Sequence, residues 1–317
     1  MLTGLIGLAA VLGVTVLALF PLIHRLHPLV WRRLVAWGIL ASLLALAVLI
    51  AWSWAAWWRI AATWTAAYLG FKALLLLHTP AAVLSGLTWW RYLGFTVGWL
   101  GMDVEPWTRP AAQLPAPIVR RRLISGLVIG LAGGALLLLI VSLPLPECWR
   151  LAQAWCAFVA GVIATFFGGT SLLTAFWNRF GRAVRPLFDQ PVYASSLGDW
   201  WGKRWNLSVH MVLTLAVWQP LRERISGAWA ATAVFAISGL LHEYLLSYPA
   251  RGGWGGPTAY FAIQAAGMYA ERQRSMRRWL RRNPVRQAGW TLGITLLPGP
   301  LLFHPPLLRA LVGPLLD

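Results

Sequence analysis

Two short segments carry the residue types best suited to chemistry. Residues 199–206 read Asp-Trp-Trp-Gly-Lys-Arg-Trp-Asn, and residues 237–244 read Ile-Ser-Gly-Leu-Leu-His-Glu-Tyr. His242 lies well inside an apolar run, residues 228–248, that is long enough as a helix to cross a bilayer. Ionisable side chains are costly at that depth, so we expect them to be functional. Desolvation disfavours the charged imidazolium, which leaves a neutral ring able to accept a proton.

Together the two segments resemble the membrane-bound O-acyltransferase superfamily, and within it the wax synthase-like branch. The residues that carry the resemblance are 196–206, Ser-Leu-Gly-Asp-Trp-Trp-Gly-Lys-Arg-Trp-Asn, and 238–244, Ser-Gly-Leu-Leu-His-Glu-Tyr. The motif-bearing core covers about 176–271, and Gly101-Met102-Asp103 is weakly similar to a segment of wax synthase-like members. The resemblance implies transfer of an acyl group from a thioester to a hydroxyl.

In this superfamily an Asn and a His inside the membrane serve the transfer, and the matching positions here are Asn206 and His242. In the sterol and diacylglycerol acyltransferase relatives the Asn directly follows Asp-Trp-Trp. Here four residues intervene, which is about one helical turn and would leave Asn206 on nearly the same helical face.

Acyl transfer to a hydroxyl needs a base and a site that excludes water. His242 is the candidate base. Asn206 could hold the histidine tautomer or donate an N–H to the carbonyl oxygen, and the sequence leaves both roles open. Ser238, one turn before His242, could orient the ring, although a small packing residue bonded to its own backbone explains it as well.

Six further residues are candidates for substrate binding. An interfacial belt of tryptophan and basic residues would explain part of this set equally well. Glu243 points away from the face of His242, so we expect it to pair with an arginine. Leu246 occupies the position of the second histidine in a zinc-protease motif, so no metal is expected. The six candidates are Asp199, Trp200, Trp201, Arg204, Trp205 and His210.

The composition predicts a single-domain, all-α, polytopic membrane protein over residues 1–317. Hydrophobic residues make up 59% of the chain and charged residues 11%, with apolar runs from end to end. The net charge of +18 is explained by basic loops facing anionic lipid, so no nucleic-acid partner is expected. The first apolar run lacks a basic n-region, so we read it as a retained span. In a bacterial cell the host would be the cytoplasmic membrane.

The charge of the loops indicates which apolar stretches cross the membrane. If all basic loops face the cytoplasm, two stretches cannot cross: one of 60–77 and 83–100, and also 206–221. This predicts about eight spans, two re-entrant or tilted segments, both termini on the non-cytoplasmic side, and a cavity near Asn206. The stretches are 2–23, 34–58, 60–77, 83–100, 123–143, 153–176, 206–221, 228–248, 257–271 and 288–312.

Residues 272–286 are rich in arginine, and Met276, Trp279 and Leu280 share one helical face. We expect a short cationic helix in the membrane interface, which could also attract the phosphates of a coenzyme A donor.

The sequence thus favours an acyl-CoA-dependent O-acyltransferase, and the resemblance to wax synthase-like members implies that its acceptor is a long-chain alcohol, sterol or related lipid. Acyl-CoA is a co-substrate, and no cofactor is expected. Two alternatives stay open: a lipid or small-molecule transporter with His242 and Glu243 as a proton relay, and an acyltransferase acting across the membrane on a polysaccharide or protein acceptor. Oligomeric state is not indicated by the sequence.

Overall fold

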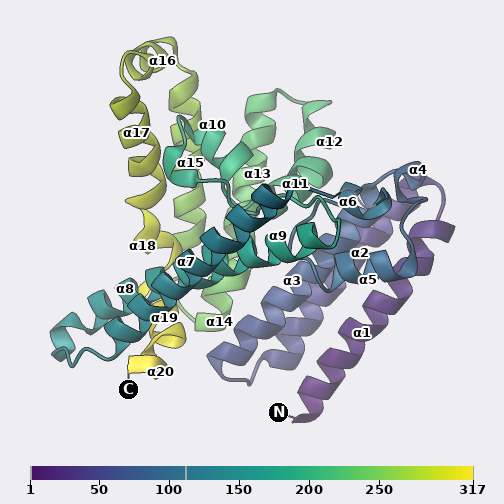
Figure 1. Ribbon diagram of the computed structural model, residues 1–317, viewed down its shortest axis with the longest axis horizontal. Coiled ribbons are helices and arrows are strands. Elements are labelled where there is room, and N and C mark those ends of the chain that lie inside the picture. The colour runs from purple at the N-terminus through teal and green to yellow at the C-terminus, as the bar shows by residue number, and fades with distance from the viewer. Residues whose placement is uncertain (1, 111–112, 317) are drawn as a thin grey trace.

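The computed structural model describes residues 2–110 and 113–316, which form helices joined by loops and contain no strand (Figure 1). This confirms the predicted all-α, polytopic class. Six helical stretches in the described part are long and apolar enough to cross a membrane. They are α1 (Leu2–Arg25), α2 (Leu29–Ala51), α3 (Ala56–His78), α7 (Ala116–Val141), the run Glu147–Arg179 and the run Gly227–Ala250.

Two of these runs are built from several elements. Glu147–Arg179 comprises η1 (Glu147–Trp149), α8 (Arg150–Val162), η2 (Ile163–Gly169) and α9 (Thr170–Arg179). Gly227–Ala250 comprises α13 (Gly227–His242), η6 (Glu243–Ser247) and α14 (Tyr248–Ala250). Both η2 and η6 are π-helical turns, a feature frequent at functional sites.

The predicted number of about eight spans exceeds the six or seven found in the described residues. A seventh span requires counting the pair Pro284–Leu302 and Pro305–Leu311 as one, although it bends by 70°. The other difference is α15 (Gly256–Arg272), whose 17 residues reach only about 26 Å, short of a hydrocarbon core of roughly 30 Å.

The sequence predicts that 206–221 and one of 60–77 and 83–100 do not cross, and residues 60–77 lie within the candidate span α3. The two remaining stretches, 83–100 and 206–221, hold only short helical elements. Residues 83–100 contain the end of α4 (Ala81–Leu84) and the whole of α5 (Trp89–Thr96). Residues 206–221 hold α11 (Leu207–Leu213), the π-helical η5 (Thr214–Trp218) and α12 (Gln219–Arg222). Neither passes as a candidate span.

At the centre of the bundle lies α3, the most buried of the candidate spans. A buried side chain of a neighbouring helix bonds to the backbone carbonyls at the carboxyl end of α3. The buried Arg32 of α2 donates to the carbonyls of Leu76 and Thr79, both at 3.0 Å, and so ties α2 to the carboxyl end of α3.

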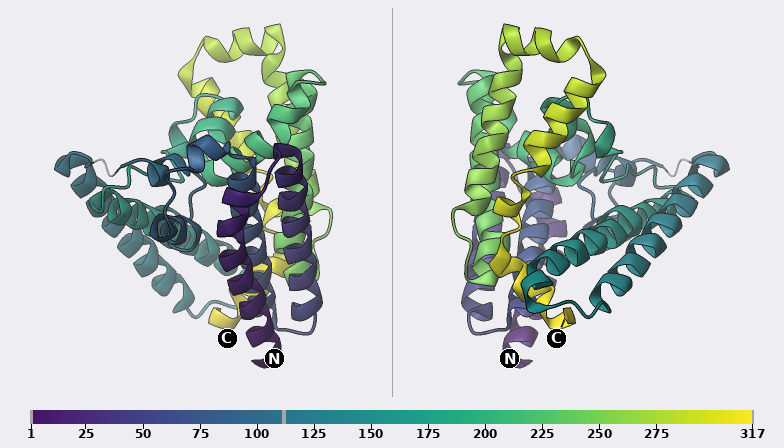
Figure 2. Two further views of the ribbon diagram at one scale, coloured as in Figure 1. Left: turned by 90° about the vertical axis from the view of Figure 1, so that its right-hand side faces the viewer. Right: turned by 90° about the vertical axis from the view of Figure 1, so that its left-hand side faces the viewer.

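An arm formed by α7, α8 and α9 leans away from the main bundle (Figure 2). Glycine allows α7 to approach η2 closely, because a Cβ on Gly133 would lie 2.7 Å from the backbone nitrogen of Ala164. The close approach holds η2 in place, and its Phe166 and Phe167 contact the rings of Phe188 and Trp205, respectively.

At the opposite end from the two chain ends, α15, α16 (Arg274–Arg281) and α17 (Pro284–Leu296) form a protruding hairpin (Figure 2). The expected cationic helix over 272–286 is shorter, because Asn283 accepts from Val285 N–H at 2.7 Å and starts α17. The remaining elements are short: α6 (Glu105–Thr108), η3 (Pro191–Tyr193), α10 (Leu197–Asp199), η4 (Trp200–Arg204), α18 (Gly299–Leu302), α19 (Pro305–Leu311) and α20 (Gly313–Leu316).

Candidate functional site

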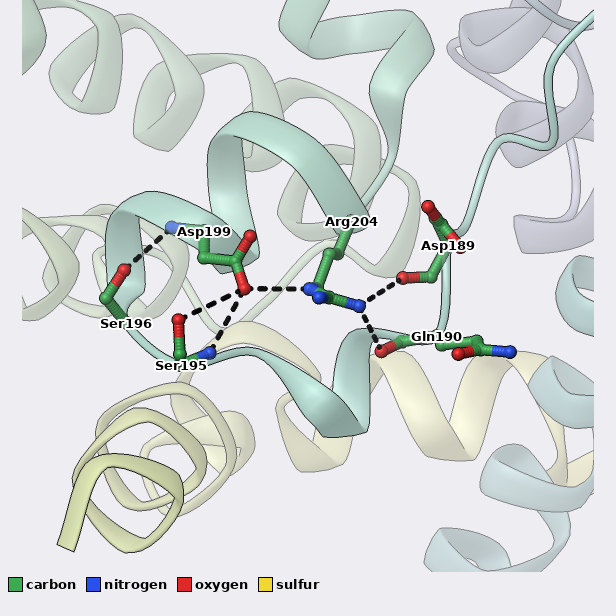
Figure 3. A network of polar contacts seen from close by, with 6 residues as sticks. All are labelled: Asp189, Gln190, Ser195, Ser196, Asp199 and Arg204. Carbon is green, nitrogen blue, oxygen red and sulfur yellow. Dashed lines mark hydrogen bonds and ion pairs between the residues drawn. The ribbon is translucent and has the colours of Figure 1, made fainter. Parts of the chain in front are cut away.

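Asp199 and Arg204 clamp the loop that carries the tryptophan-rich block (Figure 3). The Arg204 Nε lies 2.8 Å from Asp199 Oδ2, which also accepts from the backbone N–H of Ser195 at 3.1 Å. Ser196 caps α10 by accepting from Asp199 N–H at 3.0 Å. Burial raises the pKa of Asp199, but the hydrogen bonds from Arg204 and Ser195, together with the positive charges of Arg204 and Lys203, outweigh burial and hold that pKa below its ordinary value. Arg204 also donates to the carbonyls of Asp189 and Gln190.

The three tryptophans of the block face two directions. Trp200 is buried and stacks on Trp205, with ring centroids 5.2 Å apart. Trp201 donates its indole N–H to Gln264 Oε1 at 3.3 Å and packs on Phe261 of α15, with centroids 5.7 Å apart. The block therefore joins two aromatic clusters, one on each side of η4.

Asn206 does not continue the helix of the preceding block. Trp205 is extended, and Asn206 takes a left-handed conformation with φ of 41°. Asn tolerates this region better than most residues do. The expectation of one extra helical turn on the same face is therefore wrong, because η4 ends before Asn206. The Asn206 Oδ1 instead caps α11 by accepting from Val209 N–H at 3.4 Å.

His242 closes α13, and its ring has a defined tautomer. Nδ1 lies 2.7 Å from the carbonyl oxygen of Ser238, which can only accept, so Nδ1 carries the proton. Nε2 of the neutral ring then keeps its lone pair. The half-buried ring packs on Phe261 with centroids 4.6 Å apart.

The Ser238 hydroxyl donates to the carbonyl of Val234 at 2.9 Å, so Ser238 orients the ring through its backbone rather than its side chain. His210 lies one turn into α11, where Nε2 is 3.5 Å from the Thr214 hydroxyl.

The expected arginine partner of Glu243 is wrong. Its Oε1 accepts from Gly255 N–H at 3.0 Å, Thr258 N–H at 3.1 Å and the Thr258 hydroxyl at 2.9 Å. These donors lie at the start of α15, where a carboxylate is stabilised by the free amides and the helix dipole. Glu243 therefore ties η6 to α15.

Aromatic contacts connect the tryptophan-rich block, residues 199–206, to the region of His242 and η6 by two routes. The short route runs from Trp201 through Phe261 to His242. The long route is a series of ring contacts that ends where Trp64 donates to the carbonyl of Leu245 in η6 at 3.1 Å. Its members in order are Trp205, Phe188, Phe166 and Trp64. No hydrogen bond joins Asn206 to His242 within the described part of the chain, so their common cavity stays a prediction.

Lys72 was missed as a candidate, although an ionisable residue in the middle of a span is the signal that singled out His242. It is completely buried in α3, and its Nζ donates to the carbonyls of Phe95, Trp99 and Gly101 at 2.7, 2.9 and 2.7 Å. Lys72 thus holds the Gly101-Met102-Asp103 segment. That segment borders α11, because the Ser208 hydroxyl donates to the carbonyl of Leu100 at 3.3 Å.

Comparison with known proteins identifies a family profile and several similar proteins. Residues 184–263 match the profile of the membrane bound O-acyl transferase family. The chain is 33% identical over 164 residues to the long-chain-alcohol O-fatty-acyltransferase of Simmondsia chinensis, covering 45% of this chain and 46% of that protein.

Two Arabidopsis thaliana proteins are also similar. The probable long-chain-alcohol O-fatty-acyltransferase 6 is 35% identical over 142 residues, covering 41% of this chain and 40% of the relative. The acyl-CoA–sterol O-acyltransferase 1 is 37% identical over 75 residues, or 22% of each chain.

The aligned parts span less than half the length of these curated relatives. The family profile covers both the tryptophan-rich block and His242, and the apolar helices make the chain an integral, multi-pass membrane protein. Residues 184–263 are thus similar to the membrane-bound O-acyltransferase family, and the relatives found are long-chain-alcohol and sterol O-acyltransferases.

Proposed function

We propose that this protein transfers an acyl group from acyl-CoA to the hydroxyl of an apolar acceptor, a long-chain alcohol, a sterol or a related lipid. The similar proteins are named for fatty-acyl transfer to long-chain alcohols and to sterols, which supports this class of donor and acceptor.

The observation that carries the proposal is the tautomer of His242. Because Nδ1–H is held by the Ser238 carbonyl, the free lone pair is on Nε2. In the proposed step Nε2 takes the acceptor's hydroxyl proton while the hydroxyl oxygen bonds to the thioester carbonyl carbon. The carbon–sulfur bond then breaks, and the thiolate leaving group takes the proton from Nε2.

Asn206 is proposed to stabilise the thioester carbonyl oxygen, which becomes negatively charged as the acceptor oxygen attacks the carbonyl carbon. Its Oδ1 is engaged with Val209 N–H, which leaves the two amide N–H groups of Nδ2 to donate. The tautomer of His242 is already set by Ser238, so the role of donor to the carbonyl oxygen is favoured over that of tautomer holder.

Trp200, Trp201 and Trp205 are proposed to form apolar walls for the acyl chain or acceptor, because their rings join the two aromatic clusters beside η4. Asp199 and Arg204 act on the substrate only through the loop that they clamp. A transporter with a His242 and Glu243 relay is not favoured, since Oε1 of Glu243 is used at the start of α15.

The test is direct. Purified protein in detergent is incubated with a labelled acyl thioester, either acyl-CoA or an acyl carrier protein, and a panel of long-chain alcohols, sterols and glycerides. Mass spectrometry should detect an ester of an alcohol or sterol that forms with acyl-CoA. Absence of an ester with every acceptor and donor would contradict the proposal.

A further inference from the structure

A hollow of about 390 Å³ lies where the hairpin of α15, α16 and α17 meets the loop before α10. One wall is formed by Ser195, Ser196 and Gly198, and the other carries Arg272, Arg277 and Arg281. The first wall belongs to the loop that Asp199 and Arg204 clamp, so the hollow adjoins the candidate site without including its proposed catalytic residues.

The charge in this hollow is unbalanced. Arg272, Arg277 and Arg281 are exposed, and none of them forms an ion pair with a carboxylate among the described residues. Glu271 is the only acid in the wall, and its Oε1 accepts from Leu197 N–H at 2.9 Å. Three guanidinium groups against one carboxylate that already has a hydrogen-bond donor leave the hollow positive.

The wall opposite the arginines offers one free hydroxyl, that of Ser196, because the Ser195 hydroxyl donates to Asp199 Oδ2 at 3.5 Å. Ser196 Oγ accepts from Asp199 N–H, so its own O–H remains available to donate. Gly198 adds no side chain to the wall, and a Cβ there would meet only Ser196 Oγ, at 3.8 Å. The donors in this hollow are therefore guanidinium groups and a hydroxyl group, the combination that proteins use to bind phosphate.

We infer that this hollow binds a phosphate group. Its volume of about 390 Å³ also admits a phosphate that is part of a larger ligand. Two sources have this chemistry: the phosphorylated part of a soluble acyl donor, and the headgroup of an anionic lipid. The donor source rests on the proposed function, and the lipid source does not. In either case the bound anion stabilises the loop that carries Ser195 and Ser196.

The experiment uses the full chain in phosphatidylcholine nanodiscs, with binding followed by melting temperature and calorimetry. One arm adds inorganic pyrophosphate as the soluble probe, and the other replaces part of the lipid with phosphatidylglycerol. The test variant is the double substitution Arg277→Gln and Arg281→Gln. Its matched control is Arg274→Gln with Arg278→Gln, which removes the same charge from the same helix outside the hollow.

In at least one arm, wild type and control should bind and be stabilised, while the Arg277 and Arg281 variant should bind at least about tenfold more weakly, the loss expected for roughly 1.4 kcal/mol. The arm that responds identifies the source. Equal binding by test and control variants in both arms, or binding in neither, would overturn the inference. If the double variant does not fold, Arg272→Gln on α15 replaces it under the same criteria.

Binding is measured without turnover, so the two proposals can fail separately. A protein that binds pyrophosphate through Arg277 and Arg281 but esterifies no acceptor would refute the proposed function alone. An active enzyme whose test and control variants bind equally would refute the phosphate site alone.

Discussion

Replacing Lys72 by methionine tests whether a buried ammonium group holds the broken segment after α5. The methionine side chain is similar in length to that of lysine but has no hydrogen-bond donor. In the wild type Nζ donates to the carbonyls of Phe95, Trp99 and Gly101 and lies 3.6 Å from the centroid of the Phe95 ring. No acid contacts Lys72 in the described part of the chain, so these carbonyls and the ring provide its stabilisation.

The expected loss in the free energy of unfolding depends on which backbone carbonyls keep a hydrogen-bond donor when Lys72 is replaced. Trp99 O also accepts from the Tyr68 hydroxyl at 2.8 Å, whereas Phe95 O and Gly101 O would lose the donor that the structure gives them. Two buried carbonyls without donors cost about 1–3 kcal/mol each. Removing the desolvation cost of the ammonium offsets part of that loss. We expect Lys72→Met to lower the free energy of unfolding by about 2–4 kcal/mol.

The assay is the melting temperature of the detergent-purified protein, where such a loss corresponds to roughly 5–15 °C. Tyr68→Phe is the matched variant. It leaves only Thr96 O without its donor, because Trp99 O keeps Lys72, and so it should cost less. Acyl transfer should fall in Lys72→Met, since Leu100, at the start of this segment after α5, accepts a hydrogen bond from Ser208, two residues after Asn206. A Lys72→Met protein with the same melting temperature as the wild type would refute this explanation.

Three further predictions concern the caps and the clamp. Glu243→Ala should lower the melting temperature by an amount corresponding to about 1–3 kcal/mol, whereas Glu243→Gln, which keeps an acceptor for α15, should change melting and acyl transfer little; equal losses would contradict the cap. The stability advantage of wild type over Asp199→Asn should be complete above pH about 4 and disappear below it, because the folded pKa is depressed; a difference that persists at low pH in melting curves would contradict the clamp. Asn206→Ala should destabilise by about 1–2 kcal/mol more than Asn206→Gly because of its left-handed backbone, and equal melting temperatures would contradict that conformation.

The fold class and the non-crossing stretch 206–221 could be predicted from the sequence, because apolar length and loop charge act over whole segments. Which of 60–77 and 83–100 crosses could not. The partner of Glu243 could not. Helical geometry shows which face a side chain takes, but the donors come from Gly255 and Thr258 at the start of another helix, brought close only by tertiary packing.

The ion pair between Asp199 and Arg204 could not be predicted from the sequence either. Asp199 and Arg204 are five positions apart, whereas an α-helix pairs residues three or four apart. The π-helical η4 brings them together, and neither it nor the left-handed Asn206 has a signal in local residue periodicity. Lys72, in contrast, does have a local signal, because it is an ionisable side chain within an apolar run.

The central claim is that Nε2 of His242 takes the proton of the acceptor hydroxyl. Its most direct test is acyl transfer and melting temperature measured on the same purified His242→Ala protein, with Asn206→Gly as the companion variant that keeps the backbone conformation. We predict that His242→Ala melts close to the wild type and turns over about 10²–10⁴-fold more slowly. A His242→Ala protein that is folded and fully active would contradict the account.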